Sequence, residues 1–182
     1  MAEGIIAALR QDHQEVRKLF GRLEAASGKQ RRELFQRLVG ELVRHEVAEE
    51  EILRPVSMRD AGEAIANARN KEESQAEKLL KDMEKLDPDS PEFASKLAKL
   101  RRDVERHAEA EETKEFPRVA KKETTERLEQ MGRSYEAAKM AAPTRPHPST
   151  PNTPVADVLV GPFAAVLDRA RDAVRDALKS TS

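Results

Sequence analysis

Apolar residues recur every three or four positions along most of the chain, a pattern typical of amphipathic helices. The first apolar stripe spans about residues 5–25 and the second about residues 30–53, and Ser27 and Gly28 interrupt the pattern between them. The second helix is expected to end before Pro55, because the residue ahead of a proline avoids helical geometry. Nothing in the sequence alternates with a period of two, so no strand is expected.

Further helical segments follow. The third helix is expected at about residues 62–86 and the fourth at about 91–122, with a bend near Pro117. Between them, Ser90 has the position of a helix N-cap and Pro91 that of a first-turn proline. A helical stretch at about 124–141 either extends the fourth helix or folds back. Four similar helices with short connections predict an all-α fold, an up-down-up-down four-helix bundle.

The composition changes after residue 142. Residues 143–154 read PTRPHPSTPNTP, which predicts an extended proline-rich linker that contains His147 as a plain exposed residue. Residues 155–182 regain a helical pattern and form a C-terminal amphipathic helix, with Leu159, Phe163 and Leu167 on its apolar side. This side has to be covered by the chain's own bundle (residues 1–142) or by a partner, so self-association through the tail is one expectation.

Charge and composition restrict the classes of partner. The 182 residues carry a formal net charge of -1 and include no cysteine, which rules out disulfides and thiolate metal ligands. A nearly neutral chain has no general attraction for nucleic acid or for anionic membranes. The N-terminus has no signal-peptide layout and no segment is long enough to span a bilayer, so a cytoplasmic location is expected.

Two segments of the chain carry the same pair of polar residues. One reads HEVAEEEILRPV and contains His45 and Glu49, and the other reads HAEAEETKEFPRV and contains His107 and Glu111. A spacing of four residues places both members of a pair on the same side of a helix, here the apolar side. A buried histidine beside a buried carboxylate is costly unless something satisfies both groups. A metal ion does so directly, and two such pairs suggest two ions.

A third histidine, His13, lies on the apolar stripe of the first helix. Counted along the helices from the connecting turns, His13 and His45 reach about the same level, and Glu73 is level with His45 and His107. A lone histidine on an apolar stripe is more often a core residue than a ligand. Three at one level, two of them paired with glutamates, favour a metal site.

The segment DHQEVRKLF around His13, taken with the two HxxxEE segments, closely resembles the hemerythrin-like, or HHE cation-binding, family over about residues 5–120. The resemblance implies a non-heme di-iron centre inside a four-helix bundle. Family roles include oxygen binding, oxygen or iron sensing, nitric oxide handling and peroxide decomposition. Carried over residue by residue, the resemblance implies two bridging carboxylates, Glu49 and Glu111, and three histidine ligands, His13, His45 and His107.

The third helix departs from the family pattern. Where the family places one or two histidines, this chain reads KEESQAEKLLKDM, with Glu73 and Glu77 at the corresponding positions. Both are candidate metal ligands, although Glu77 also suits a solvent-facing pair with Lys81. Glu46 is an alternative ligand. A carboxylate-rich shell of this kind resembles ferritin-like sites, casts doubt on reversible oxygen carriage and accepts iron or manganese.

These features predict a di-iron protein that binds or reacts with a small oxidant: peroxide, dioxygen or nitric oxide. The favoured role is redox protection by peroxide decomposition. The alternatives are a non-catalytic oxygen or iron sensor or iron-binding protein, and a metal-free structural bundle. Glu50 and Glu112, which neighbour predicted ligands, are expected around the site or in solvent, and Tyr135 is expected to serve in packing.

Overall fold

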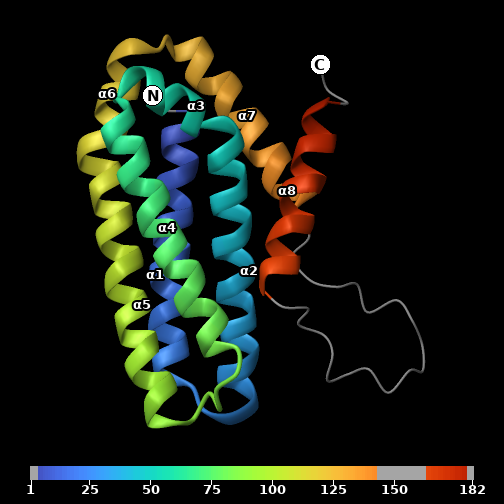
Figure 1. Cartoon of the computed structure of the whole chain (residues 1–182). Helices are drawn as coiled ribbons and strands as arrows, with labels where there is room; N and C mark the ends of the chain where they lie inside the picture. Colours follow the sequence, from blue (N-terminus) through green and yellow to red (C-terminus); the bar gives the residue numbers. More distant parts are fainter. Residues whose placement is uncertain (1–3, 143–162, 180–182) are drawn as a thin grey trace.

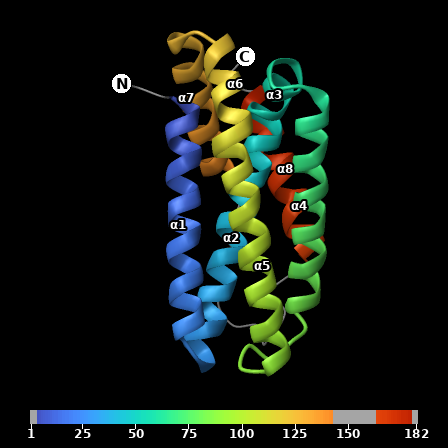
Figure 2. The same ribbon diagram turned by 90° about the vertical axis from the view of Figure 1, so that its left-hand side faces the viewer.

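The computed structural model describes residues 4–142 and 163–179, and every regular element within these ranges is helical. Four long helices run alternately up and down beside one another (Figure 1): α1 (Ile5–Ala25), α2 (Gly28–Ile52), α4 (Glu63–Met83) and α5 (Pro91–Ala110). In Figure 2, α5 stands between α1 and α4 on the face turned to the viewer. The expected all-α, up-down-up-down bundle is confirmed.

Two turns meet at one end of this bundle. Gly28 opens α2 with a φ of 55°, a value that glycine adopts at little cost, and its N–H donates to the two carboxylate oxygens of Asp89 at 3.0 and 2.9 Å. Asp89 belongs to the turn before α5, where the Ser90 hydroxyl accepts a hydrogen bond from the Phe93 N–H at 3.1 Å. Ser90 is therefore the N-cap, as expected, and the two turns are fastened to each other.

At the other end, α2 and α5, the helices of the two histidine–glutamate pairs, change course. α2 ends at Ile52, and after Leu53 the chain continues as a short helix, α3 (Arg54–Asp60), which the sequence pattern did not predict. α5 passes into a π-helical turn, η1 (Glu111–Glu115), and then into α6 (Phe116–Lys122). A proline lies in the first turn of both α3 and α6, where its missing N–H is tolerated. The expected bend near Pro117 is thus a π-helical turn just before it.

The next helix, α7 (Thr125–Ala141), folds back over the bundle and packs against α1 and α2 (Figure 1). Close approach to α1 depends on Gly132, where a Cβ atom would lie 2.9 Å from the carbonyl carbon of Gly4. This path resolves the alternative that the sequence left open, and it carries Tyr135 into the protein interior.

The last described helix, α8 (Phe163–Lys179), packs against α2 and α7 of the same chain (Figure 1). Ala170 and Val174 are buried there, and Arg171 Nε lies 3.0 Å from a carboxylate oxygen of Glu50. The predicted linker at 143–154 and Leu159 lie outside the described residues, as do the side chains of Phe163 and Leu167. Among the described helices, none is long and apolar enough to cross a membrane.

Candidate metal centre

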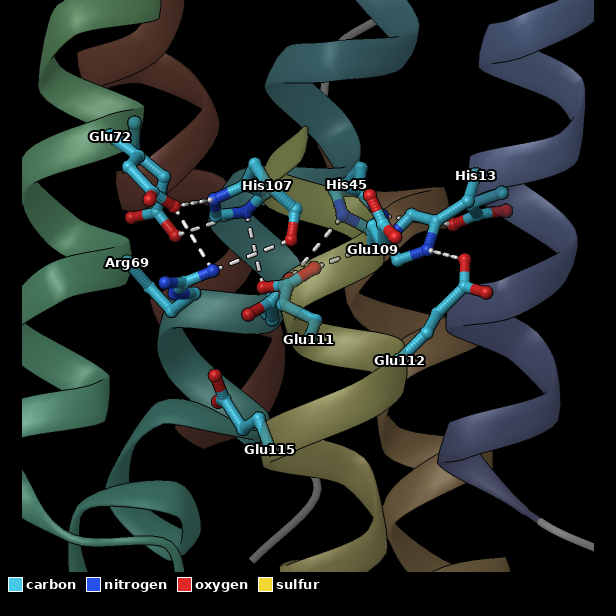
Figure 3. Close-up of polar contacts among 12 residues, drawn as sticks. His13, His45, Arg69, Glu72, His107, Glu109, Glu111, Glu112 and Glu115 are labelled. Carbon is cyan, nitrogen blue, oxygen red and sulfur yellow. Dashed lines mark hydrogen bonds and ion pairs between the residues drawn. The ribbon is translucent and has the colours of Figure 1, made fainter. Parts of the chain in front are cut away.

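Three histidines and two glutamates converge at mid-height in the bundle. His13 comes from α1, His45 and Glu49 from α2, His107 from the end of α5, and Glu111 from the start of η1. Their ligand atoms form two groups, His13–His45–Glu111 and Glu49–His107–Glu111, and within each group these atoms lie within 4.8 Å of one another. Glu111 belongs to both groups, and in Figure 3 it lies below the three histidines.

The Nε2 atom of each histidine faces this centre. Nε2 of His13 lies 3.3 Å from one oxygen of Glu111, and Nε2 of His107 lies 3.1 Å from the other oxygen. Nε2 of His45 lies 3.3 Å from Oε2 of Glu49. One carboxylate therefore spans two histidines from different helices, which is the arrangement that a carboxylate bridge between two metal ions requires.

The opposite ring nitrogens of His13 and His107 are held by carboxylates. Nδ1 of His13 lies 2.8 Å from Oε1 of Glu112, and Nδ1 of His107 lies 3.0 Å from Oε2 of Glu72 (Figure 3). A carboxylate accepts a hydrogen bond, so Nδ1 carries the proton and the Nε2 lone pair is directed to the centre. Metal-binding histidines in proteins are oriented in this way. Arg69 in turn fixes Glu72, with its Nη1 atom 3.1 Å from Oε2.

His45 has a different partner. Its Nδ1 atom lies 2.8 Å from the phenolic oxygen of Tyr135, and this hydroxyl donates to Oδ2 of Asp12 at 2.6 Å. Because the single phenolic proton goes to Asp12, the His45 Nδ1–H donates to the phenolic oxygen. Lys139 donates to the other oxygen of Asp12 at 2.6 Å. The chain of contacts leaves Nε2 of His45 for the centre, as in the other two histidines.

The polar atoms at the centre fit a bound cation. Nε2 of His13 and both oxygens of Glu111 are buried, and none of them has a hydrogen-bond partner among the described residues. Glu111 is 0% exposed, and a buried carboxylate without hydrogen-bond partners is costly. Imidazole nitrogens together with carboxylate oxygens form a donor set that suits iron and manganese.

Neighbouring groups shift the pKa values of the histidines and carboxylates at the centre. Burial acts to lower the pKa of His45, but its hydrogen bonds to Asp12 and Glu49 outweigh burial and raise the pKa to about 10. Burial acts to raise the pKa of Glu111, but the charge of His107 outweighs it and holds this pKa well below the usual value. The metal-free centre therefore retains protons on histidine that a metal ion would displace.

The two third-helix candidates lie in different surroundings. Oε1 of Glu73 is 3.8 Å from Nε2 of His107, at the edge of the second group, and Glu73 also forms an ion pair with Arg54. Glu77 lies outside both groups and faces Lys81 and Arg171 at 3.8 and 3.7 Å. The structure therefore brings Glu73 toward the centre and directs Glu77 to α8.

Glu46, the alternative ligand, lies close to both of these glutamates. Burial, followed by the negative charges of Glu73 and Glu77, raises its pKa well above the usual value. The structure places Glu46 on the wall of a cavity beside the centre and outside both groups of ligand atoms.

That cavity has a volume of about 60 Å³, room for a few molecules of the size of water. Its polar wall includes four of the candidate ligands, His13, His45, Glu49 and His107. Apolar side chains of four helices also line it: Val16, Leu42, Ala76, Leu80 and Val104. On another side of His13 the ring of Phe116 stacks at 6.0 Å between centroids. The space beside the centre is thus restricted to small molecules.

The comparison with known families agrees with this geometry. The hemerythrin HHE cation binding domain matches residues 4–119 of the chain. The chain belongs to the hemerythrin HHE cation-binding family. Hemerythrin-like domains bind non-heme iron, so the residues described above lie in an iron-binding protein.

Two sequence relatives and one solved structure are similar to this chain. An uncharacterized hemerythrin-like protein of Schizosaccharomyces pombe is 27% identical over 169 residues, which cover 91% of this chain and 83% of the relative. A protein of Nostoc named DNA nickase is 30% identical over 132 residues, 72% of this chain, but the match spans only 38% of that relative. The crystal structure of a hemerythrin HHE domain-containing protein from Mycobacterium kansasii shares the fold, with a TM-score of 0.69 and 21% identity over 75% of this chain and 85% of that one.

Sequence reasoning missed several residues of this hemerythrin-like centre. Tyr135 was expected to serve in packing, yet it contacts His45 directly. Arg54 and Glu115 were not singled out, although both are buried beside Glu49.

Proposed function

We propose that this hemerythrin-like protein holds two iron ions and uses them to react with a small oxidant, with peroxide decomposition as its favoured activity. The observation that carries the proposal is the position of Glu111. Its two oxygens face histidines of different helices, and it belongs to both groups of ligand atoms. A single-ion site has no need of a carboxylate shared in this way.

The proposed assignment of ligands to each ion rests on these two groups of ligand atoms. We infer that His13, His45 and Glu111 hold one ion, and that Glu49, His107 and Glu111 hold the other. Glu73 is the further ligand of the second ion, because it lies at the edge of that group. A bound iron pair supplies, at one place, the two electrons that a peroxide O–O bond accepts. The donor set also accepts manganese, which metal analysis distinguishes.

The chain's own residues prepare this chemistry. Glu112, Glu72 and Tyr135 fix the histidine rings, so that the ligand geometry is present before the metal binds. The cavity has room for molecules of the size of peroxide, dioxygen or nitric oxide. In the favoured reaction two peroxide molecules yield dioxygen and two water molecules. One peroxide is oxidised and the other is reduced, so no separate electron donor is required.

The test combines metal analysis with oxygen evolution. Protein loaded with ferrous iron is expected to retain two ions per chain and to release dioxygen when peroxide is added. Glu111→Gln is expected to lose iron and activity together, whereas Glu105→Gln, which changes a carboxylate outside both groups of ligand atoms, serves as the matched control. A content of one ion per chain would contradict the proposed iron pair. An iron-loaded protein that leaves peroxide intact would contradict the proposed activity.

A second function, a non-catalytic sensor, is favoured by one observation. α8 packs on α2, the helix that carries His45 and Glu49, and Arg175 of α8 lies 2.7 Å from Glu51 of α2. A change at the centre that shifts α2 would reach these contacts. If iron or oxygen alters the protease sensitivity of α8 while peroxide remains unconsumed, the sensor is the better description.

A further inference from the structure

We propose that Arg54 is a permanent counter-ion of the metal centre. It balances the buried carboxylates while no metal is bound, and it fixes which oxygen of Glu49 is offered to a metal. The inference rests on the proposed metal centre for its second part, whereas its first part concerns the metal-free protein alone.

The contacts of Arg54 join three carboxylates of three different elements. Its Nη2 atom lies 2.8 Å from Oε1 of Glu49 and also pairs with Glu73, and its Nη1 atom lies 3.5 Å from Oε1 of Glu115. Arg54 is only 5% exposed. An arginine remains protonated even when buried, and its planar fork can serve several carboxylates at once, which a lysine ammonium does less well.

Two irregular turns place this cation. α2 ends at Ile52, and α3 begins at Arg54 after a turn at Leu53. Arg54 is buried at this break in the helix. On the facing helix, the π-helical turn η1 places Glu115 in the interior at 0% exposure. α3 packs against α6, which follows η1, so the two departures from α-helix meet at the centre.

The positive charge of Arg54 compensates the negative charges of the three carboxylates. Glu49, Glu73 and Glu115 are acidic groups held in the interior, and a buried charge is tolerated only when it is paired. A metal ion supplies positive charge only when it is bound. Arg54 supplies it at all times, and this allows the bundle to fold first and take up metal afterwards.

Arg54 also constrains Glu49. Because Nη2 of Arg54 binds Oε1, Oε2 is the oxygen that faces Nε2 of His45, at 3.3 Å. Glu49 is thereby prepared to bind through one oxygen, and not as the two-oxygen bridge that the family resemblance implies. The same positive charge close to an iron pair favours the ferrous state, because it opposes the addition of a further positive charge to the metal. Arg54 therefore counteracts the preference for the ferric state that a carboxylate-rich shell produces.

The first test uses the metal-free protein. Arg54→Met, which keeps a long side chain and removes the charge, is expected to lower the melting temperature at pH 7.5 by about 10 °C, as expected when one partner of a buried ion pair is lost. The melting temperature of Arg54→Lys should fall between those of the unchanged chain and Arg54→Met. The control is Arg118→Met on α6, the helix against which α3 packs, where the arginine is exposed and little change is expected.

A packing role and a charge role are then separated. Arg54→Met combined with Glu115→Gln should be more stable than Arg54→Met alone, because the double variant no longer buries the Glu115 carboxylate without its cation. The double variant also provides a folded protein if the single variant does not fold. The counter-ion role of Arg54 would be overturned if the metal-free Arg54→Met protein melted at the same temperature as the unchanged chain. It would also be overturned if the double variant were no more stable than the single one.

The second test uses the iron-loaded protein. Arg54→Met is expected to regain most of its lost stability on iron binding and to show a lower reduction potential than the unchanged chain. An unchanged reduction potential in Arg54→Met would overturn the claim that Arg54 favours the ferrous state. If the chain retained no iron at all, the proposed function would fail, while the metal-free comparison would still decide whether Arg54 is the counter-ion.

Discussion

The phenolic oxygen of Tyr135 lies 2.8 Å from Nδ1 of His45, although the two residues are 90 positions apart in the chain. α7 reaches this position because it folds back over α1 and α2. The same hydroxyl donates to Asp12 at 2.6 Å, so one phenol links the folding-back of α7 to the orientation of a predicted metal ligand.

The first prediction follows from this contact. Tyr135→Phe keeps the ring in the core but removes the partner of His45 Nδ1, and it should weaken iron binding about 10- to 100-fold. Chelator competition measures this affinity, and Asp12→Asn should act in the same direction. Lys139→Met, which removes the contact to Asp12 furthest from the histidine, is the milder control. Equal chelator sensitivity of Tyr135→Phe and the unchanged chain would contradict the role assigned to the phenol.

The second prediction concerns the pH dependence of the metal-free protein. Burial raises the pKa of Glu73 and of Glu115 to about 7, and the partners of His45 raise its pKa to about 10. For the carboxyls, the raised pKa stabilises the fold below about pH 4.5, and this contribution is lost as the pH rises to 7. For His45 it is present below about pH 6.5 and is lost as the pH rises to 10.

The contributions of the carboxyls and of His45 have the same sign, so the melting temperature of the metal-free protein should fall steadily from about pH 6 to pH 9.5.

Iron-loaded protein should behave in the opposite way and lose iron as the pH falls, because protons then compete for the histidines. Loaded protein should also melt well above the metal-free form, since the ion binds only the folded state. Glu115→Gln should flatten the metal-free profile. A profile that rises between pH 6 and 9.5 would argue against these buried groups.

The third prediction compares the two acidic residues of α4. Glu73→Ala should lose part of the bound iron and most of any peroxide activity, because Glu73 lies 3.8 Å from Nε2 of His107. Glu77→Ala should have a smaller effect, since Glu77 faces Lys81 and Arg171. Metal analysis and the absorption spectrum of loaded protein provide the comparison. The opposite ranking would show that Glu77, and not Glu73, completes the metal shell.

A fourth prediction addresses the cavity. Ala76→Leu adds volume to its wall and should slow peroxide consumption by about tenfold, equivalent to about 1.4 kcal/mol in the barrier, while the iron content stays unchanged. Ala64→Leu, at an exposed position of the same helix, is the control. Unchanged kinetics in Ala76→Leu would mean that the oxidant reaches the metal by another route.

The fifth prediction is that removal of residues 143–182 leaves the iron stoichiometry unchanged, because every proposed ligand precedes this segment. The melting temperature should fall by roughly 5 °C, since the buried Ala170 and Val174 and the ion pairs of Arg171 are lost. The surface of α2 and α7 that becomes uncovered should promote self-association, which light scattering detects. Loss of iron from the truncated protein would require a ligand in the tail.

The sequence predicted the helices well because helical periodicity and turn residues act locally. It also predicted that His45, Glu49, His107 and Glu111 would share one side of their helices, since a spacing of four residues sets this directly. The level of His13 followed from counting along the helix. These inferences need only the geometry of single helices and short turns.

The remaining parts of the centre depend on how helices pack, which periodicity does not reveal. Tyr135 meets His45 only because Gly132 lets α7 approach α1. Arg54 points inward because of a break at Leu53, and Glu115 because of a π-helical turn, and five residues of sequence do not distinguish such a turn from α-helix. The tail pattern predicted an apolar side but not that α2 and α7 would cover it.

The position of Tyr135 gives the protein a built-in optical reporter. The chain has no tryptophan and a single tyrosine, so its intrinsic fluorescence originates from one phenol. That phenol is hydrogen-bonded to the ring that we infer binds iron. Iron uptake, its oxidation state and its release should therefore each change the emission of an unmodified chain, and stopped-flow fluorescence can follow the occupancy of the His45 position in real time without a label.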